Sequence, residues 1–170
     1  MTTADIVSPT LAPSCLSIIT VNIQSLLSKP RSTGDTAVVH KAELEARLSI
    51  LNPHIVCVQE TWLDASVVDL SFHGYCVASR RDRLGGRKAG YGGILLLIRN
   101  DLDCVIDLYQ GKVAEYTFST IHTSIGPILL CNWYRPGEVG RIAIDAFRED
   151  YETYICDHVG AIVMGDLNVH

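Results

Sequence analysis

The sequence predicts a single α/β domain in which apolar strands alternate with helices. Strand-like apolar runs and helix-like segments alternate along the 170 residues, with no internal repeat or low-complexity block. The run ILLLI at residues 94–98 has no polar side chain, which is typical of a strand buried on both faces. Hydrophobic residues make up 48% of the chain and charged residues 19%, a composition that supports a buried core and argues against disorder.

The first half of the chain predicts two strands separated by a helix. Residues 16–21 (LSIITV) are a β-rich apolar run. Residues 35–51 place three leucines on one helical face, and the Asn-Pro pair that follows ends the helix because the residue before a proline is disfavoured in the α region. Residues 55–58 (IVCV) form the next predicted strand.

The second half predicts further strands and one more helix. The strands are expected at residues 94–98, 104–108, 115–122, 127–133 and 161–164. Before the last of them, residues 140–158 carry an apolar stripe at helical spacing, which indicates a helix packed on the core. Residues 80–88, between glycine-rich turns, are expected to form a loop.

Neither the first fourteen residues nor the apolar runs predict a secretory signal or a membrane helix. Residues 1–14 have no basic start before an apolar run and are expected to be a disordered tail, with the domain at residues 15–170. The apolar runs are far shorter than the roughly 20 residues that a membrane helix needs. Six single cysteines without a CxxC pair favour reduced thiols over disulfides, and so an intracellular protein that is not secreted.

Positive charge is concentrated in one segment of an otherwise acidic chain. The net charge is −5, yet residues 80–88 hold five basic residues and one acidic residue. Such a segment is suited to the phosphate backbone of a nucleic acid, and a solvated loop without a partner fits the same composition. The candidate nucleic-acid-binding residues are Arg80, Arg81, Arg83, Arg87 and Lys88.

Polar side chains follow three of the predicted strands at the point where each strand ends. Asn22 follows the first, Glu60 the second, and Asp166 and Asn168 the last. Functional groups collect at strand ends in α/β sheets, although a single Asp or Asn there is more often a turn former. Three instances in one chain therefore predict a site.

The chemistry of these side chains fits metal-assisted phosphate ester hydrolysis. Carboxylate and amide oxygens are ligands that Mg²⁺ prefers, which makes Glu60 the main candidate ligand, with Asn22 binding or orienting the same ion. Asp166 is suited to aligning and deprotonating the attacking water. Asn168 is placed to present N–H groups to the negative charge that develops on phosphoryl oxygens.

The ordered runs ITVNIQSL, VCVQETWL, GYGGILLLIR, CNWYRPG and VMGDLNVH resemble the exonuclease-endonuclease-phosphatase superfamily. They look most like the apurinic/apyrimidinic-endonuclease-like domain of non-long-terminal-repeat retrotransposons. The resemblance implies a DNase I-like sandwich of two sheets flanked by helices, hydrolysis of phosphodiester bonds with Mg²⁺ or Mn²⁺, and DNA as partner. By position it assigns Asn22, Glu60, Asp166 and Asn168 the roles above. Tyr134 matches the family tyrosine near the scissile phosphate, where the residues alone would favour a packed aromatic.

The resemblance also implies that the domain is incomplete. Family members continue with more strands, another metal-site Asp and a Ser-Asp-His-type motif, so these 170 residues alone are expected to be inactive. A downstream reverse transcriptase region and a nuclear location are further implications of the resemblance.

Two other functions fit the same residues. One is a phosphatase of the same superfamily that acts on phosphoinositide or sphingolipid head groups, because a basic segment suits an acidic lipid surface as well as DNA. The other is a non-catalytic remnant that binds nucleic acid. Since all four strand-end residues are present, inactivity would come from truncation and not from point substitution.

Overall fold

A computed structural model describes residues 10–27, 40–83, 91–136 and 140–168. The described residues form ten helices and strands. In chain order these are β1 (Ile18–Asn22), α1 (His40–Leu51), β2 (Ile55–Gln59), β3 (Tyr75–Arg81), β4 (Ile94–Arg99), β5 (Val105–Gln110), β6 (Glu115–Thr123), β7 (Gly126–Tyr134), α2 (Arg141–Ile155) and β8 (Gly160–Asp166).

The strands form two four-stranded sheets of mixed direction. The first has the order β1-β2-β4-β3 and the second β5-β6-β7-β8. Only β1 with β2 and β7 with β8 pair in parallel, and each of these pairs is joined by a segment that contains a helix, as parallel pairing requires.

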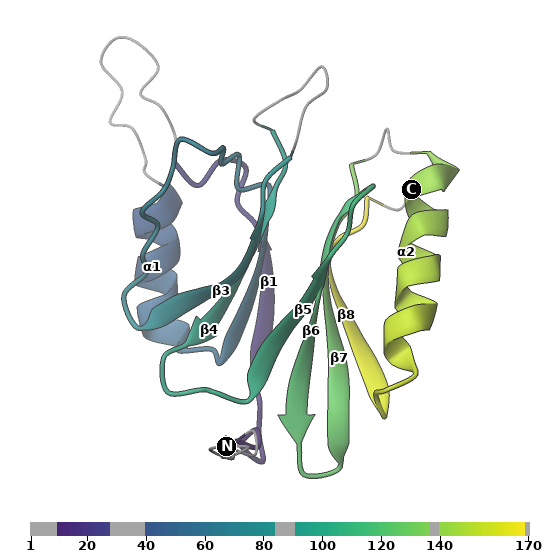
Figure 1. Ribbon diagram of the computed structural model, residues 1–170. Coiled ribbons are helices and arrows are strands. Elements are labelled where there is room, and N and C mark those ends of the chain that lie inside the picture. Colours follow the sequence, from purple (N-terminus) through teal and green to yellow (C-terminus); the bar gives the residue numbers. More distant parts are fainter. Residues whose placement is uncertain (1–9, 28–39, 84–90, 137–139, 169–170) are drawn as a thin grey trace, which may run out of the picture.

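The two sheets face each other, and each helix covers an outer face (Figure 1). One cluster of buried apolar side chains packs α1 on the first sheet through Leu44 and Leu48. A second lies between the sheets, and a third packs α2 on the second sheet around Tyr116 and Phe118. The predicted α/β sandwich flanked by helices is confirmed.

The first predicted helix agrees with α1 over residues 40–51, while residues 35–39 lie outside the described part. The predicted strands in both halves correspond to β1, β2 and β4 to β8.

Strand β3 was not predicted, and the expected loop at residues 80–88 is wrong at its start. Arg80 and Arg81 are the last residues of β3, paired with Leu95 and Ile94 of β4. Because β3 is an edge strand with one neighbour, it tolerates Ser and Arg where a central strand would not. Residues 84–90 lie outside the described part.

The expected tail at residues 1–14 is described only from Thr10. The Ala12 amide donates to the His122 carbonyl oxygen at 2.7 Å, and the Thr10 hydroxyl donates to Asp103 at 2.8 Å. These residues therefore contact the second sheet and the turn before it.

The cysteines divide into two groups of three. Cys57, Cys104 and Cys131 are buried, whereas Cys15, Cys76 and Cys156 are exposed, and all six are free thiols. Among the residues with described structure, neither helix has the length and apolar character needed to cross a membrane.

Candidate functional site

The polar residues that end three strands meet at one end of the sandwich. The parallel pairing places Asn22 opposite Gln59, and it places Tyr134 opposite Asp166. The carboxyl ends of β1, β2 and β8 all point to the upper end in Figure 1. Parallel strands of both sheets thus deliver their terminal side chains to a common edge.

Asn22 connects the two carboxylates of the site. Its Nδ2 donates to Glu60 Oε1 at 2.9 Å and to Asp166 Oδ2 at 2.7 Å, across 38 and 144 residues of sequence. Its Oδ1 accepts from the Gln24 amide at 3.2 Å. A cavity of about 190 Å³ between β1 and α1 also borders Asn22. The two N–H groups of one amide therefore hold two carboxylates from different sheets side by side.

Glu60 lies in a strained turn that follows β2. Its φ is 53°, in the left-handed region that is costly for a residue with a side chain. The Ser25 amide donates to the Glu60 carbonyl oxygen at 2.8 Å, and the Trp62 indole donates to Glu60 Oε2 at 3.2 Å. The surrounding contacts hold the carboxylate in this unusual conformation.

Tyr134 ends β7 and contacts the same carboxylate. Burial of the phenol, followed by a hydrogen bond to Glu60 and its charge, raises the pKa of Tyr134 to about 12. The hydroxyl is therefore a proton donor at neutral pH. The guanidinium of Arg83 lies over its ring, 5.6 Å from the centroid.

Asp166 and Asn168 follow a glycine that the structure requires. A Cβ at Gly165 would lie 1.8 Å from the Trp133 carbonyl oxygen, and its φ of 143° is one that other residues rarely adopt. Beyond it, the Asn168 amide donates to Asp166 Oδ1 at 3.3 Å. The Asn168 side-chain Nδ2 donates to the Arg135 carbonyl oxygen at 2.8 Å. Asp166 and Asn168 are thereby fixed as one unit.

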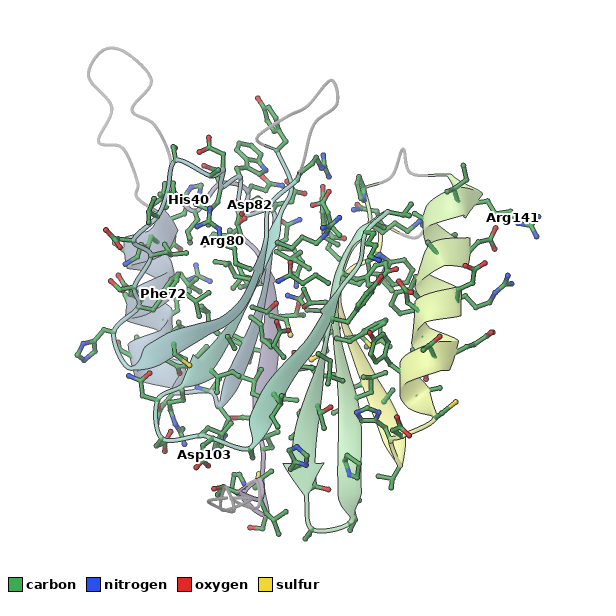
Figure 2. All side chains as sticks on the ribbon, in the orientation of Figure 1. His40, Phe72, Arg80, Asp82, Asp103 and Arg141 are labelled. Atoms are coloured by element: carbon green, nitrogen blue, oxygen red, sulfur yellow. The ribbon has the colours of Figure 1, made fainter. Side chains whose placement is uncertain are left out.

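The described members of the predicted basic set bind protein groups. Arg80 pairs with Asp82 at 2.7 Å, and both lie near the upper end of the molecule in Figure 2. Arg81 donates to the carbonyl oxygens of Ala114 and Lys112 at 3.2 and 3.3 Å. Arg87 and Lys88 lie outside the described residues. Of the three described arginines, only Arg83 is seen in contact with a predicted site residue.

A buried ion pair supports Arg83. Its Nε lies 2.5 Å from Glu115 Oε1, and Glu115 Oε2 accepts from the Gly93 amide. The side chains of Arg83 and Glu115 are 18% and 9% exposed, so the pair is shielded from solvent. It joins β6 to the turn before β4 and sets the guanidinium above Tyr134.

Sequence reasoning missed a buried amide pair behind the site. Gln59 Nε2 donates to Asn132 Oδ1 at 2.8 Å, and Asn132 Nδ2 donates to the Leu95 carbonyl oxygen at 2.9 Å. Both side chains are 1% exposed. The pair bridges the two sheets one residue before Glu60 and two before Tyr134. The available signal in the sequence was a polar residue within an apolar run, Gln59 in VCVQ and Asn132 in LLCNW.

The donor set fits a hard divalent ion. Within residues 10–27, 40–83, 91–136 and 140–168, no three His, Cys, Asp or Glu side chains group as a metal site. Glu60 and Asp166 nevertheless share one amide partner. Mg²⁺ is commonly held by one or two carboxylates, with water and substrate phosphate completing its shell. The residues present match that mode of binding.

Solved structures share this fold and span more sequence than this chain. An AP endonuclease, LMAP, from Leishmania major superposes with a TM-score of 0.63 at 19% identity, over 91% of this chain and 55% of its own. The endonuclease domain of TRAS1, a telomere-specific non-LTR retrotransposon, superposes with a TM-score of 0.63 at 18% identity. The match covers 91% of this chain and 61% of the TRAS1 domain. The 3′ phosphatase NExo from Neisseria, bound to a product DNA hairpin, superposes with a TM-score of 0.56 at 16% identity. The match covers 91% of this chain and 58% of the NExo chain.

The two packed sheets and their flanking helices form a DNase I-like α/β sandwich. The chain covers less than two thirds of the length of these structures. No match was found among curated proteins. The model of the Endonuclease/Exonuclease/phosphatase family matches residues 19–170, nearly the whole chain. This chain belongs to that family, which confirms the resemblance of its motifs.

Proposed function

We propose that this chain is part of a divalent-metal-dependent endonuclease that nicks DNA, of the kind carried by non-LTR retrotransposons. The observation that carries the proposal is the Asn22 amide between the carboxylates of Glu60 and Asp166. Three strands that are far apart in sequence converge to make this contact. A purely structural strand end does not need two adjacent carboxylates, because each loses hydration when it is brought into the fold.

Each residue has a distinct part in phosphodiester hydrolysis. Glu60 would hold the ion, with Asn22 binding or orienting it, and the ion would neutralise phosphate charge. Asp166 aligns a water molecule and takes its proton as the water oxygen bonds to phosphorus. The P–O bond to the leaving sugar oxygen breaks, and that oxygen takes a proton from solvent. Asn168 donates N–H groups to the phosphoryl oxygens. The neutral Tyr134 hydroxyl donates a hydrogen bond to the Glu60 carboxylate and so orients it.

DNA is the proposed substrate. The family match and the similarity to the TRAS1 endonuclease domain support it. The basic residues Arg87 and Lys88 are proposed to contact the phosphate backbone. Arg80, Arg81 and Arg83, whose N–H groups bind protein atoms, are proposed to add positive charge to the same surface. Nuclear action and a downstream reverse transcriptase region belong to the same proposal.

The test is nicking of supercoiled plasmid by the full-length protein in Mg²⁺ and in EDTA. We expect Mg²⁺-dependent nicking that Glu60→Gln and Asp166→Asn each lower at least about 100-fold, since each removes a group needed in the transition state. Asp103→Asn is the matched control, because Asp103 is exposed at the opposite end of the sandwich (Figure 2).

Three other results would replace the proposal. Nicking that is unchanged in Glu60→Gln would remove the assigned site. Hydrolysis of phosphoinositide or sphingolipid phosphates without nicking would identify a phosphatase. DNA binding that persists in EDTA, with no hydrolysis under any condition, would identify a non-catalytic binding protein.

A further inference from the structure

Two aromatic side chains stand together beside the candidate site without belonging to the core. The rings of Trp62 and Tyr91 have centroids 4.6 Å apart and an interplanar angle of 58°. Tyr91 is 50% exposed, and Trp62 is half-buried. Neither ring belongs to the three apolar clusters that the described residues form. Packing of the core therefore does not account for the pair.

The backbone holds both rings in place at a cost. Trp62 has a φ of 54°, which is unfavourable for a large side chain. The Trp62 amide donates to the Gly92 carbonyl oxygen at 2.8 Å, and the Thr61 amide donates to that of Gly93 at 3.2 Å. A Cβ at Gly93 would lie 2.7 Å from Thr61 Oγ1, so the two loops approach too closely for a larger residue. The turn after β2 and the turn before β4 are thus tied together.

The pair adjoins the reacting groups directly. The indole Nε1 of Trp62 donates to Glu60 Oε2 at 3.2 Å, on the carboxylate whose other oxygen binds Asn22. A phosphate held near Glu60 through a bound ion would therefore lie beside an aromatic surface. Strained backbone that presents side chains at such a place points to a ligand contact.

We propose that Trp62 and Tyr91 form a stacking platform for a nucleobase of the DNA next to the scissile phosphate. The inference rests on the proposed nuclease function and deepens it by assigning a base contact to the site. Aromatic rings bind any base through its π-face, whereas a phosphate backbone alone offers nothing to stack. Removal of either ring weakens DNA binding without removing a metal ligand.

The test measures binding of the full-length protein in EDTA to two probes of equal charge. One is a 20-nucleotide oligothymidylate, and the other is an abasic oligomer of the same length. We expect Tyr91→Leu and Trp62→Leu to bind the oligothymidylate about 5- to 150-fold more weakly, the range for loss of one stacked base. Tyr91→Phe keeps the ring and should keep the affinity. Affinity for the abasic oligomer should be the same in all variants.

Fluorescence locates the contact. The chain has two tryptophans, and Trp133 is 8% exposed and stacked on Phe147 at 3.9 Å. In a Trp133→Phe background Trp62 is the remaining reporter, and its emission should be quenched by the oligothymidylate and not by the abasic oligomer. Ile142→Ala on α2, 75% exposed, is the control that changes a distant surface.

The outcomes separate this inference from the proposed function. Plasmid nicking with normal affinity in both leucine variants would overturn the platform and leave the nuclease standing. Equal loss of affinity for both oligomers would also overturn it, because the contact would then be to the backbone. If the unaltered protein neither binds nor nicks DNA, the proposed function fails and the platform with it.

Discussion

The buried amide pair behind the site should be strongly coupled in stability. Asn132→Leu keeps the approximate shape of the side chain but removes the acceptor for Gln59 Nε2 and the donor to the Leu95 carbonyl oxygen. A buried polar group without a partner costs about 1–3 kcal/mol, so two such groups give an expected loss of about 2–6 kcal/mol. Burial at 1% exposure leaves water little access to replace either bond.

A double-mutant cycle measures the bond itself. Gln59→Leu orphans Asn132 Oδ1 and frees the hydroxyl of Thr20, which is exposed and can bind water. In the double variant both side-chain amides are absent, so neither is buried without its partner. We therefore expect it to lose less unfolding free energy than the sum of the single variants, by about 1–2 kcal/mol. Equilibrium unfolding in urea, followed by circular dichroism, gives the four values.

Asn100→Leu makes the same chemical change at an exposed turn and should alter stability by less than about 0.5 kcal/mol. Additive losses at residues 59 and 132, within about 0.3 kcal/mol, would show that the two amides do not interact. The account of how the sheets are joined behind the site would then be wrong.

Three further predictions follow from single contacts. Gly165→Ala should cost more than about 3 kcal/mol or prevent folding, because its Cβ would meet the Trp133 carbonyl oxygen, whereas Gly160→Ala has open space; thermal melting compares the two. At pH 8 the three exposed thiols should react with a disulfide reagent at once and the three buried ones only after unfolding, as burial raises the pKa of Cys57 and of Cys131 to about 12. The pKa of Tyr134 in the folded protein lies above its usual value near 10, so the stabilising contribution of Tyr134 is complete below pH 10 and is lost as pH rises toward 12. Over that interval Tyr134→Phe should lose less unfolding free energy than the unaltered protein, as urea unfolding at each pH would measure.

Strands with one simple environment were predictable from sequence. β2 and β4 are buried along nearly their whole length, so a continuous apolar run describes them fully. β3 was not predicted because its residues YCVASRR alternate between buried, exposed and half-buried positions without a regular period. Its final arginines look like a solvated loop in sequence, yet Arg80 donates to the Val67 carbonyl oxygen at 2.6 Å and to the Asp64 carbonyl oxygen at 2.7 Å. Partners thirteen or more residues away carry no local signal.

The same distinction holds within the candidate site. Asn22, Glu60 and Asp166 stood out because each ends an apolar run, and the structure brings these three together. Gln59 and Trp62 stand in the same QETWL motif as Glu60, but sequence reasoning assigned neither a role in the site, since their partners Asn132 and Tyr91 come from other strands and turns. Roles that depend on pairing across the two sheets required the fold.

The bond from Asn22 to Asp166 also sets a time at which the site can exist. The two residues are 144 positions apart, and at a synthesis rate of about 5–20 residues per second the ribosome needs about 7–30 s to pass from one to the other. During that interval Glu60 can already be in its turn after β2, but its neighbouring carboxylate has not been made. A growing chain therefore carries an unassembled site until β8 is synthesised and pairs with β7, however early the first sheet forms.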